Sequence, residues 1–336
     1  MTNLNLDGKS LLVTGGTGSF GKRFIKTVLS RYKPRRLIIF SRDELKQYEL
    51  ALEVNAQKYP CVRYFIGDVR DVTRLEMAMR DINIVVHAAA LKQVSTAEYN
   101  PFECIKTNVH GAENIVQAAL RNGVQKVIAL STDKAANPIN LYGASKLASD
   151  KIFIAANNLS GTIGTRFSVA RYGNVIGSRG SVVPFFQQLV NQGAKELPIT
   201  DPRMTRFWIT ISQGVDFVLS SLQLMAGGEI FVPKIPSMKV VDVARALAPN
   251  LPHKVVGIRP GEKLHEVMVG EDDALNTLML PDRYVIQPSF AFWTREPSYA
   301  KDAKPVVDGF SYASHTNDQW LDQKEFLGLA NESGVV

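Results

Sequence analysis

The stretch SLLVTGGTGSFGKRFIKTVL, residues 10–29, joins an apolar run, a glycine-rich turn and a helical pattern. Its glycines at positions 15, 18 and 21 follow the apolar run directly. Glycine permits a tight turn and lets backbone N–H groups approach a pyrophosphate, while the N-terminus of the following helix favours anions. This strand–turn–helix order predicts a dinucleotide-binding unit, and it is more specific than glycine spacing alone.

Similar apolar runs recur through the first half of the chain, separated by helical patterns. One helix is well delimited, with Asn100 as N-cap, Pro101 at its first position and Gly123 just past its end. Strands that are apolar throughout and alternate with helices indicate a parallel sheet covered on both faces. The predicted fold class is α/β, a Rossmann-type doubly wound parallel sheet. Its expected strands are 10–14, 36–40, 62–67, 83–90, 126–131 and 165–171.

The pattern changes near residue 172, after which prolines interrupt shorter elements. We predict a dinucleotide-binding domain over residues 1–172, to which a helix within 205–227 returns. A smaller mixed α/β substrate-binding domain is expected over 173–204 and 228–287. The remaining segment, 288–336, is a less regular tail and a candidate oligomer contact.

Composition limits the class of protein. The 336 residues are 45% hydrophobic and 21% charged, which is ordinary for a globular protein. No apolar run approaches the roughly 18 residues of a membrane span, and the first residues lack the pattern of a signal peptide, so we expect a cytoplasmic protein. Cys61 and Cys104 have no metal-ligand spacing, and neither a disulfide framework nor a metal site is expected. The net charge of +7 suits a phosphate-bearing ligand, but the scattered basic residues do not predict a nucleic-acid-binding face.

The second expected strand bears on the identity of the dinucleotide. It ends IIFSRDE, so Ser41 and Arg42 stand where a carboxylate would bind the ribose hydroxyls of NAD. Arginine can bind a 2′-phosphate that a carboxylate would repel, which favours NADP(H). Asp43 or Glu44 could still turn back to the ribose, and Arg42 could be an ordinary surface residue. Further cofactor contacts are expected from the glycine turn and from later strand ends: Gly15, Thr17, Gly18, Ser19, Phe20, Gly21, Asp68, Val69, Ala88, Ala89 and Ala90.

The stretch STDKAANPINLYGASK, residues 131–146, carries the expected chemistry. Tyr142 and Lys146 stand four residues apart on a helical pattern and share one face. A nearby lysine charge stabilises phenolate, which makes a tyrosine usable as a base, and the same lysine can hydrogen-bond the nicotinamide ribose. Ser131 or Thr132 can bind the substrate oxygen. The pattern predicts hydride transfer at an alcohol, but it does not explain the acid and the base that stand side by side before the tyrosine, Asp133 and Lys134.

Six motifs together resemble the extended short-chain dehydrogenases/reductases that act on nucleotide sugars. They are the glycine turn, HAAALK, STDK, YGASK, RYGNVIGSRGSVVP and RPGEKLHE. As a set they are similar to the UDP-N-acetylglucosamine 4,6-dehydratases, and most to the C5-inverting type that begins pseudaminic acid synthesis, a route used in flagellin glycosylation. The resemblance implies UDP-N-acetylglucosamine as substrate and a homo-oligomer, a dimer or a larger assembly such as a hexamer, with neither nucleic acid nor membrane as partner.

The resemblance also implies a reaction in which NADP(H) is tightly held and regenerated in each turnover. Tyr142 takes the proton of the sugar 4-hydroxyl as hydride leaves C4, and the new ketone acidifies the C5 hydrogen. A base then removes that hydrogen, an acid protonates the departing 6-hydroxyl, hydride returns to C6, and C5 is reprotonated. By analogy with the inverting family Asp133 is the acid and Lys134 the base, whereas retaining relatives resemble one another in an Asp-Glu pair.

These two roles require shifted pKa values, raised for Asp133 and lowered for Lys134. Burial disfavours the charged form of each group, so it raises the pKa of Asp133 and lowers the pKa of Lys134. A cationic Lys146 nearby would lower the pKa of Lys134 further. Neighbours on a regular strand point to opposite faces, so we expect the pair in an irregular turn beyond the strand, supported by Asn137-Pro138. An ordinary solvated Asp-Lys pair is the alternative.

The expected substrate contacts also follow from the resemblance. Arg259 is the candidate for a bidentate diphosphate contact, with Glu262 at the ribose hydroxyls. Lys92 is placed near the acetamido sugar, although an ordinary salt bridge would explain it as well. The remaining contacts are Asn174, Arg179, Gly180, Ser181, Val182 and Thr200.

Three other functions compete with this reading. A retaining 4,6-dehydratase or a 4-epimerase would share the tyrosine, but an epimerase needs no elimination acid, so the pair Asp133-Lys134 argues against it. A non-catalytic NADP-binding regulator would not need Tyr142 and Lys146. A basic nucleic-acid-binding protein would show a recognition motif, and none is found.

Overall fold

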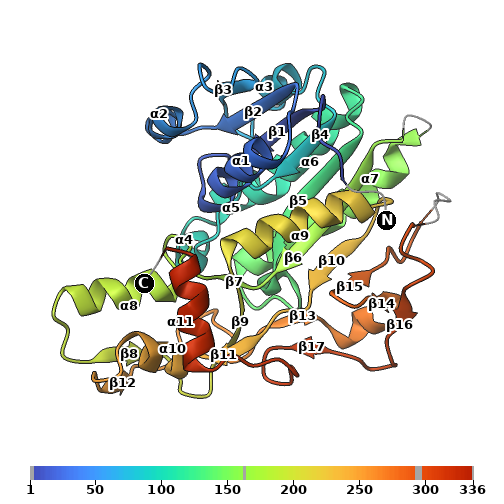
Figure 1. Ribbon diagram of the computed structural model, residues 1–336. Coiled ribbons are helices and arrows are strands. Elements are labelled where there is room, and N and C mark those ends of the chain that lie inside the picture. The colour runs from blue at the N-terminus through green and yellow to red at the C-terminus, as the bar shows by residue number, and fades with distance from the viewer. Residues whose placement is uncertain (1–3, 162–163, 292–296, 335–336) are drawn as a thin grey trace.

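A ten-stranded sheet forms the centre of the structure (Figure 1). The computed structural model describes residues 4–161, 164–291 and 297–334. The strands of this sheet are β1 (Ser10–Thr14), β2 (Arg36–Ser41), β3 (Val62–Ile66), β4 (Ile84–His87), β5 (Lys126–Thr132), β6 (Arg166–Tyr172), β10 (Ile230–Pro233), β14 (Thr277–Met279), β15 (Arg283–Ile286) and β16 (Lys304–Pro305). The order β3-β2-β1-β4-β5-β6-β10 is parallel, and β15, β14 and β16 continue the sheet antiparallel. The strand order reverses between β1 and β4, the point at which open α/β sheets bind ligands.

Helices cover both faces of the sheet, which confirms the predicted doubly wound α/β class (Figure 1). They are α1 (Ser19–Arg31), α2 (Glu44–Glu53), α3 (Val72–Ala78), α4 (Val94–Tyr99), α5 (Pro101–Ile105), α6 (Gly111–Arg121), α7 (Leu141–Leu159) and α9 (Ile211–Leu224). Helix α1 packs beside α9, whereas α6 packs beside both α3 and α7. Among the described residues, no helix is both long and apolar enough to cross a bilayer.

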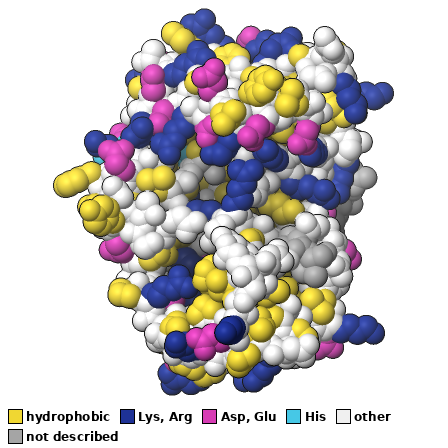
Figure 2. Space-filling model, turned by 90° about the vertical axis from the view of Figure 1, so that its left-hand side faces the viewer, with side chains coloured by type: hydrophobic (Ala, Val, Ile, Leu, Met, Phe, Trp, Pro, Cys, Tyr) yellow, Lys and Arg dark blue, Asp and Glu magenta, His cyan; other side chains and the backbone are white. Residues whose placement is uncertain are grey.

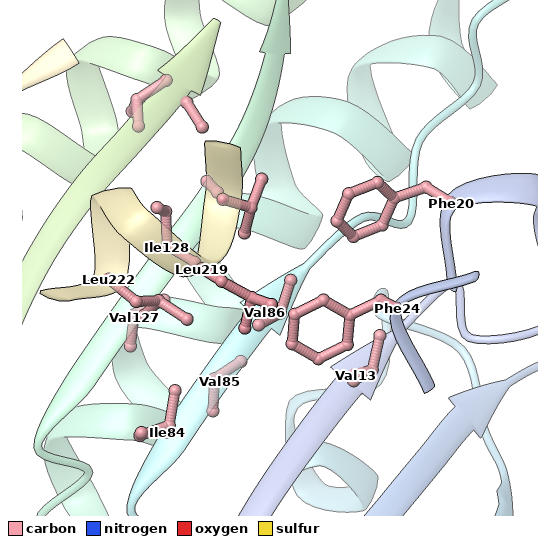
Figure 3. Close-up of a cluster of buried hydrophobic side chains, with 14 of the residues drawn as sticks. Val13, Phe20, Phe24, Ile84, Val85, Val86, Val127, Ile128, Leu219 and Leu222 are labelled. Carbon is pink, nitrogen blue, oxygen red and sulfur yellow. The ribbon is translucent and has the colours of Figure 1, made fainter. Parts of the chain in front are cut away.

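The core beneath α1 and α9 explains why a helix from the second half of the chain returns to this domain. Figure 3 shows side chains of both helices lying over the apolar strands. Phe24 and Leu222 are completely buried there, and burying a large apolar side chain stabilises the fold by about 1.5–3 kcal/mol. The members labelled in the figure are Val13, Phe20, Phe24, Ile84, Val85, Val86, Val127, Ile128, Leu219 and Leu222.

The helix predicted between residues 100 and 123 contains an irregular turn. A π-helical turn over Lys106–His110 separates α5 from α6. Asn108 in this turn donates to the Leu91 carbonyl and accepts from the Leu91 N–H, both at 2.9 Å, and also donates to Ser145 on α7. The turn therefore ties the loop after β4 to the helix that carries the predicted tyrosine, and such turns are frequent at functional sites.

A second, smaller unit lies below the large sheet in Figure 1. It contains a three-stranded sheet, a two-stranded sheet and three helices. Trp208 and Phe326 meet edge to face in one of its two apolar clusters, with ring centroids 5.5 Å apart. Its elements are β7 (Asn174–Val175), α8 (Val182–Asn191), β8 (Leu197–Ile199), β9 (Thr205–Ile209), β11 (Ser237–Lys239), α10 (Val240–Leu247), β12 (His253–Val255) and α11 (Gln323–Glu332).

The structure divides the chain differently from the predicted boundaries. Residues 228–287 were expected in the substrate domain, yet β10, β14 and β15 belong to the large sheet because each pairs with a strand of that sheet. Within 205–227 only α9 packs on the large sheet, because β9 pairs with β7 and β11 of the smaller unit. The tail 288–336 contributes β16 to the large sheet, and its β17 (Tyr312–Ala313) pairs with β13 (Val267–Val269).

Candidate active site

A cavity of about 1030 Å³ lies between the large sheet and the smaller unit. Its wall runs from the glycine turn after β1, past the ends of β4 and β5, to the segment that precedes β13. Figure 2 shows this side of the molecule, hollowed between its upper and lower parts and bordered by lysine and arginine side chains. A long, basic cavity at the carboxyl ends of parallel strands suits an anionic dinucleotide and a second anionic ligand.

The glycine turn leaves room for a pyrophosphate. Gly15 has a φ of +64°, and a Cβ there would lie 2.9 Å from the backbone of Ala88 and Ala89. Gly18 is the N-cap of α1, so the free N–H groups of the first helical turn lie at the cavity. A Cβ on Gly21 would lie 2.5 Å from Gly16. The helix can pack this closely on the turn because Gly21 has no Cβ.

The cavity wall includes all but one of the expected cofactor residues. Glu44 lies in the first turn of α2, outside the wall formed by the described residues, because Asp43 starts the helix by accepting from the Lys46 N–H. The residues in the wall are Gly15, Thr17, Gly18, Ser19, Phe20, Gly21, Ser41, Arg42, Asp43, Asp68, Val69, Ala88, Ala89, Ala90, Tyr142 and Lys146.

The end of β2 presents cations to the cavity. Ser41 is hydrogen-bonded to Thr17 at 2.8 Å, and Asp43 is engaged in its helix cap. Arg42 is half exposed, with a guanidinium nitrogen 3.7 Å from Asp68, whose carboxylate also binds Arg70 at 2.8 Å. Burial raises the pKa of Asp68, but the two arginines outweigh burial and hold that pKa below its usual range. Arg42 is therefore the side chain at this strand end that can turn toward a 2′-phosphate on the adenosine ribose of a bound dinucleotide.

The acid–base pair lies in an irregular turn, as expected. Strand β5 ends at Thr132 and is followed by a single 3₁₀ turn over Asp133–Ala135, with Asn137 in a left-handed conformation at φ +46°. Lys134 lies in the cavity wall, whereas Asp133 lies behind it and is only 1% exposed. The Asp133 carboxylate accepts from the Thr132 hydroxyl at 2.9 Å and from the Lys134 ammonium at 3.0 Å.

The electrostatics of this pair agree with one expectation and differ from another. Burial raises the pKa of Asp133, as an acid requires. The pKa of Lys134 is raised rather than lowered: burial opposes the ammonium, but the carboxylates of Asp133 and Glu266 outweigh it. Burial also raises the pKa of Tyr142 to about 12, and the cation that counteracts this is Lys134 instead of the expected Lys146.

Lys146 lies in the cavity wall, and its neighbour Asp150 belongs to a buried network. Burial lowers the pKa of Lys146, and the charge of Asp150, one helical turn further along α7, counteracts that effect. Asp150 accepts from Ser131 at 2.7 Å and from Arg171 at 3.2 Å. Arg171 is 2% exposed and also donates to the Met268 carbonyl. The network therefore connects α7, β5, β6 and β13 under the reacting groups.

The expected substrate residues lie at the other end of the cavity. Arg259 and Glu262 face each other at 3.7 Å, and Lys92 donates to the Arg179 carbonyl at 2.9 Å. Burial lowers the pKa of Lys92. The following all lie in the wall: Lys92, Asn174, Arg179, Gly180, Ser181, Val182, Thr200, Arg259 and Glu262.

Two buried charged residues of the wall were not predicted. Glu266 lies 3.1 Å from the Lys134 ammonium, and Arg206 lies 3.7 Å from Glu266. Glu266 ends the motif RPGEKLHE, which the sequence analysis singled out for Arg259 and Glu262 only. No local spacing relates it to Lys134, because the two are brought together by the fold alone.

Comparisons with known proteins agree with this architecture. The profile of a family described as "Polysaccharide biosynthesis protein" matches residues 11–288. A UDP-N-acetylglucosamine 4,6-dehydratase (inverting) of Campylobacter jejuni is 60% identical over 330 residues, 97% of this chain and 98% of that relative. A UDP-glucose 4-epimerase of Rickettsia rickettsii is 43% identical over 96% of this chain and 95% of its own length.

Two solved structures share the fold. Pen from Bacillus thuringiensis superimposes with a TM-score of 0.89, is 33% identical, and is matched over 98% of this chain and 99% of its own. DesIV from Streptomyces venezuelae, a dTDP-glucose 4,6-dehydratase with NAD and TYD bound, has a TM-score of 0.69, 24% identity and coverage of 76% and 86%, which shows the fold alone. The chain therefore belongs to the polysaccharide biosynthesis family that the profile describes, together with the inverting UDP-N-acetylglucosamine 4,6-dehydratases.

Proposed function

We propose that this chain is a UDP-N-acetylglucosamine 4,6-dehydratase that inverts C5 and forms UDP-2-acetamido-2,6-dideoxy-β-L-arabino-hex-4-ulose. The observation that carries the proposal is the Lys134 amine, which lines the cavity near Tyr142 and contacts the buried Asp133 carboxylate. A dehydratase needs a base for C5 and an acid for the 6-hydroxyl beside the tyrosine, and this turn supplies both kinds of group. The 60% identity to an inverting relative supports the same activity.

NADP(H) is the proposed cofactor. The close approach of Gly15 to Ala88 and the N-terminus of α1 fit a dinucleotide pyrophosphate, and Arg42 fits a 2′-phosphate. When bound, the nicotinamide supplies reversible hydride transfer at the sugar. Lys146, which lies in the cavity wall, would hold the nicotinamide ribose.

Each proton then has a residue to hold it. The Tyr142 hydroxyl is hydrogen-bonded to Thr132, and the positive charge of Lys134 favours its phenolate form, which accepts the proton of the sugar 4-hydroxyl. The Lys134 ammonium first passes a proton to the Asp133 carboxylate, 3.0 Å away, and the amine so formed accepts the C5 proton. Asp133 supplies the proton for the departing 6-hydroxyl, and it reaches the cavity through the Thr132 hydroxyl and the Lys134 nitrogen, which both contact its Oδ1.

The wider proposal places the enzyme in the cytoplasm as a homo-oligomer. It would take UDP-N-acetylglucosamine as the first step of pseudaminic acid-type sugar synthesis, which serves flagellin glycosylation. The identity to the inverting relative supports the substrate, whereas the compartment, the assembly and the pathway rest on the resemblance of the sequence motifs.

The activity is tested by incubating the purified protein with UDP-N-acetylglucosamine and NADP⁺ in deuterated water and following the proton spectrum. We expect loss of water without net reduction of the cofactor, deuterium at C5 and the arabino configuration. The 43% identity to an epimerase makes C4 epimerisation the second candidate. A product epimerised at C4 with its 6-hydroxyl intact, or one that keeps its configuration at C5, would contradict the proposal.

Replacement of Arg42 tests the choice of cofactor. Arg42→Ala should weaken NADP⁺ binding by roughly 10–100-fold, since a hydrogen bond to a charged group contributes about 1.5–3 kcal/mol, and should leave NAD⁺ binding almost unchanged. Isothermal titration with both dinucleotides measures the effect. Arg245→Ala is the matched control, because Arg245 is equally exposed, 56% against 57%, and lies outside the cavity wall. Equal losses for both dinucleotides would show that Arg42 does not recognise the 2′-phosphate.

A further inference from the structure

The Lys134 ammonium lies between two buried carboxylates rather than one. Its Nζ is 3.0 Å from Asp133 Oδ1 and 3.1 Å from Glu266 Oε1, and both acids are only 1% exposed. Each carboxylate has a second oxygen, Asp133 Oδ2 and Glu266 Oε2, for which the described residues provide no hydrogen-bond partner. The three side chains therefore form one compact charged cluster at the cavity wall.

Glu266 is directed at Lys134 and not chiefly at its other cationic neighbour. Arg206 Nε is 3.7 Å from the same Glu266 oxygen, and the Arg206 guanidinium donates to the carbonyls of Thr205, Lys263 and Leu264. Arg206 thus has hydrogen-bond partners of its own on the backbone, and the shorter contact of Glu266 is with Lys134.

The backbone at Glu266 is held from both sides. Its N–H donates to the Ser314 hydroxyl at 2.9 Å, and the Ser314 N–H donates to its carbonyl at 2.8 Å. Ser314 in turn is hydrogen-bonded to Thr205 at 2.7 Å. A carboxylate that is buried against a cation is costly unless it is fixed in place, and this double attachment fixes it.

The pKa values of the two acids are shifted in opposite directions. The pKa of Asp133 is raised, first by burial and also by the negative charge of Glu266. The pKa of Glu266 is lowered, because Lys134, Arg206 and Lys263 outweigh the effect of burial. These opposite shifts favour a proton on Asp133 and a negative charge on Glu266. The charged or titratable groups that face Lys134 are Asp133, Glu266, Arg206, Tyr142 and Lys263.

We propose that Glu266 is a positioning residue for the elimination: its carboxylate carries the permanent negative charge of the cluster, holds Lys134 at the cavity wall and leaves the exchangeable proton to Asp133. In the step itself the Lys134 ammonium first passes a proton to the Asp133 carboxylate, and the C5–H bond then breaks as its proton joins the Lys134 amine so formed. The electron pair left on C5 forms the C5–C6 double bond as the 6-hydroxyl leaves with the Asp133 proton. The new ammonium is stabilised by Glu266, so the residue favours the charged product of proton transfer. This role rests on the proposed dehydratase activity.

The test uses the full-length protein with Glu266→Gln, which keeps the shape and removes the charge. We follow the Lys134 side-chain nitrogen by NMR as pH is raised, in protein carrying ¹⁵N-lysine, with the signal assigned by its loss in Lys134→Met. The titration of Lys134 should move to lower pH by about one unit or more, since an opposite charge within about 4–6 Å shifts a pKa by about 1–3 units. In the same variant kcat should fall roughly tenfold or more while KM for the sugar nucleotide stays near its wild-type value.

Two further variants complete the test. Glu266→Asp should restore part of the kcat and most of the Lys134 titration, and it serves if Glu266→Gln does not fold. Glu271→Gln removes an exposed carboxylate from the same segment and should change neither measurement. An unchanged Lys134 titration in Glu266→Gln, or a rise in KM with kcat unchanged, would overturn the role. Because the NMR titration needs no turnover, a protein that fails to dehydrate UDP-N-acetylglucosamine but shows the shift would contradict the proposed function and leave the charge cluster intact.

Discussion

Lys134→Met should slow the release of water from UDP-N-acetylglucosamine by roughly 100- to 10,000-fold, the usual contribution of a general acid or base. The amine is the group of this turn that lies in the cavity wall, and methionine keeps its length without its charge or its lone pair. Deuterium incorporation at C5 should disappear together with water release. Binding of NADP⁺ should be unchanged, because the glycine turn and Arg42 are untouched.

Proton spectra in deuterated water and calorimetric titration with NADP⁺ provide the two measurements. The matched control is Lys263→Met, which removes a neighbouring lysine of the wall whose Nζ donates to the Ala136 carbonyl and which should lower the rate far less. A Lys134→Met variant that releases water at the wild-type rate would show that another group takes the C5 proton.

Asp150→Leu should destabilise the folded protein by about 3–5 kcal/mol, since removing one partner of a buried ion pair leaves the other charge uncompensated. Asp150 is completely buried, and its loss would leave Arg171 with a single carbonyl partner, that of Met268. Ser131 would lose its acceptor as well. Urea unfolding followed by circular dichroism measures the change.

Asp216→Leu is the control for this loss. Its carboxylate pairs with Arg31 at the surface, where about half of each side chain is exposed, and such a pair contributes about 0–1 kcal/mol. The double change Asp150→Leu with Arg171→Leu should recover a large part of the loss, because two apolar side chains leave no unpaired charge. Equal destabilisation by Asp150→Leu and Asp216→Leu would mean that the buried network does not hold the site together.

The dinucleotide half could be predicted from the sequence because its signals are local. Gly15, Gly18 and Gly21 lie within one turn and its helix, and the apolar strands carry their own pattern. The placement of Asp133 and Lys134 beyond β5 also followed from neighbouring residues, since adjacent strand positions face opposite sides.

The charge states of the site could not be predicted in the same way. The sequence suggested Lys146 as the cation that acts on Tyr142 and Lys134, because it is near in the chain. The fold brings Glu266 to Lys134, and the carboxylates of Asp133 and Glu266 reverse the expected shift in the pKa of Lys134. A pKa depends on the charges that tertiary structure brings together, and short sequence motifs do not record them.

The attachment of Glu266 to Ser314 also bears on how the protein is made. Synthesis proceeds from the N-terminus, and the strands of the dinucleotide half through β6 can pair before residues 312–314 have left the ribosome. Those residues, which pair with β13 and hold the Glu266 backbone, are made after every one of these strands. A nascent chain would thus have its cofactor cradle early and its complete acid–base cluster late, so that binding of the dinucleotide would precede the ability to act on a sugar.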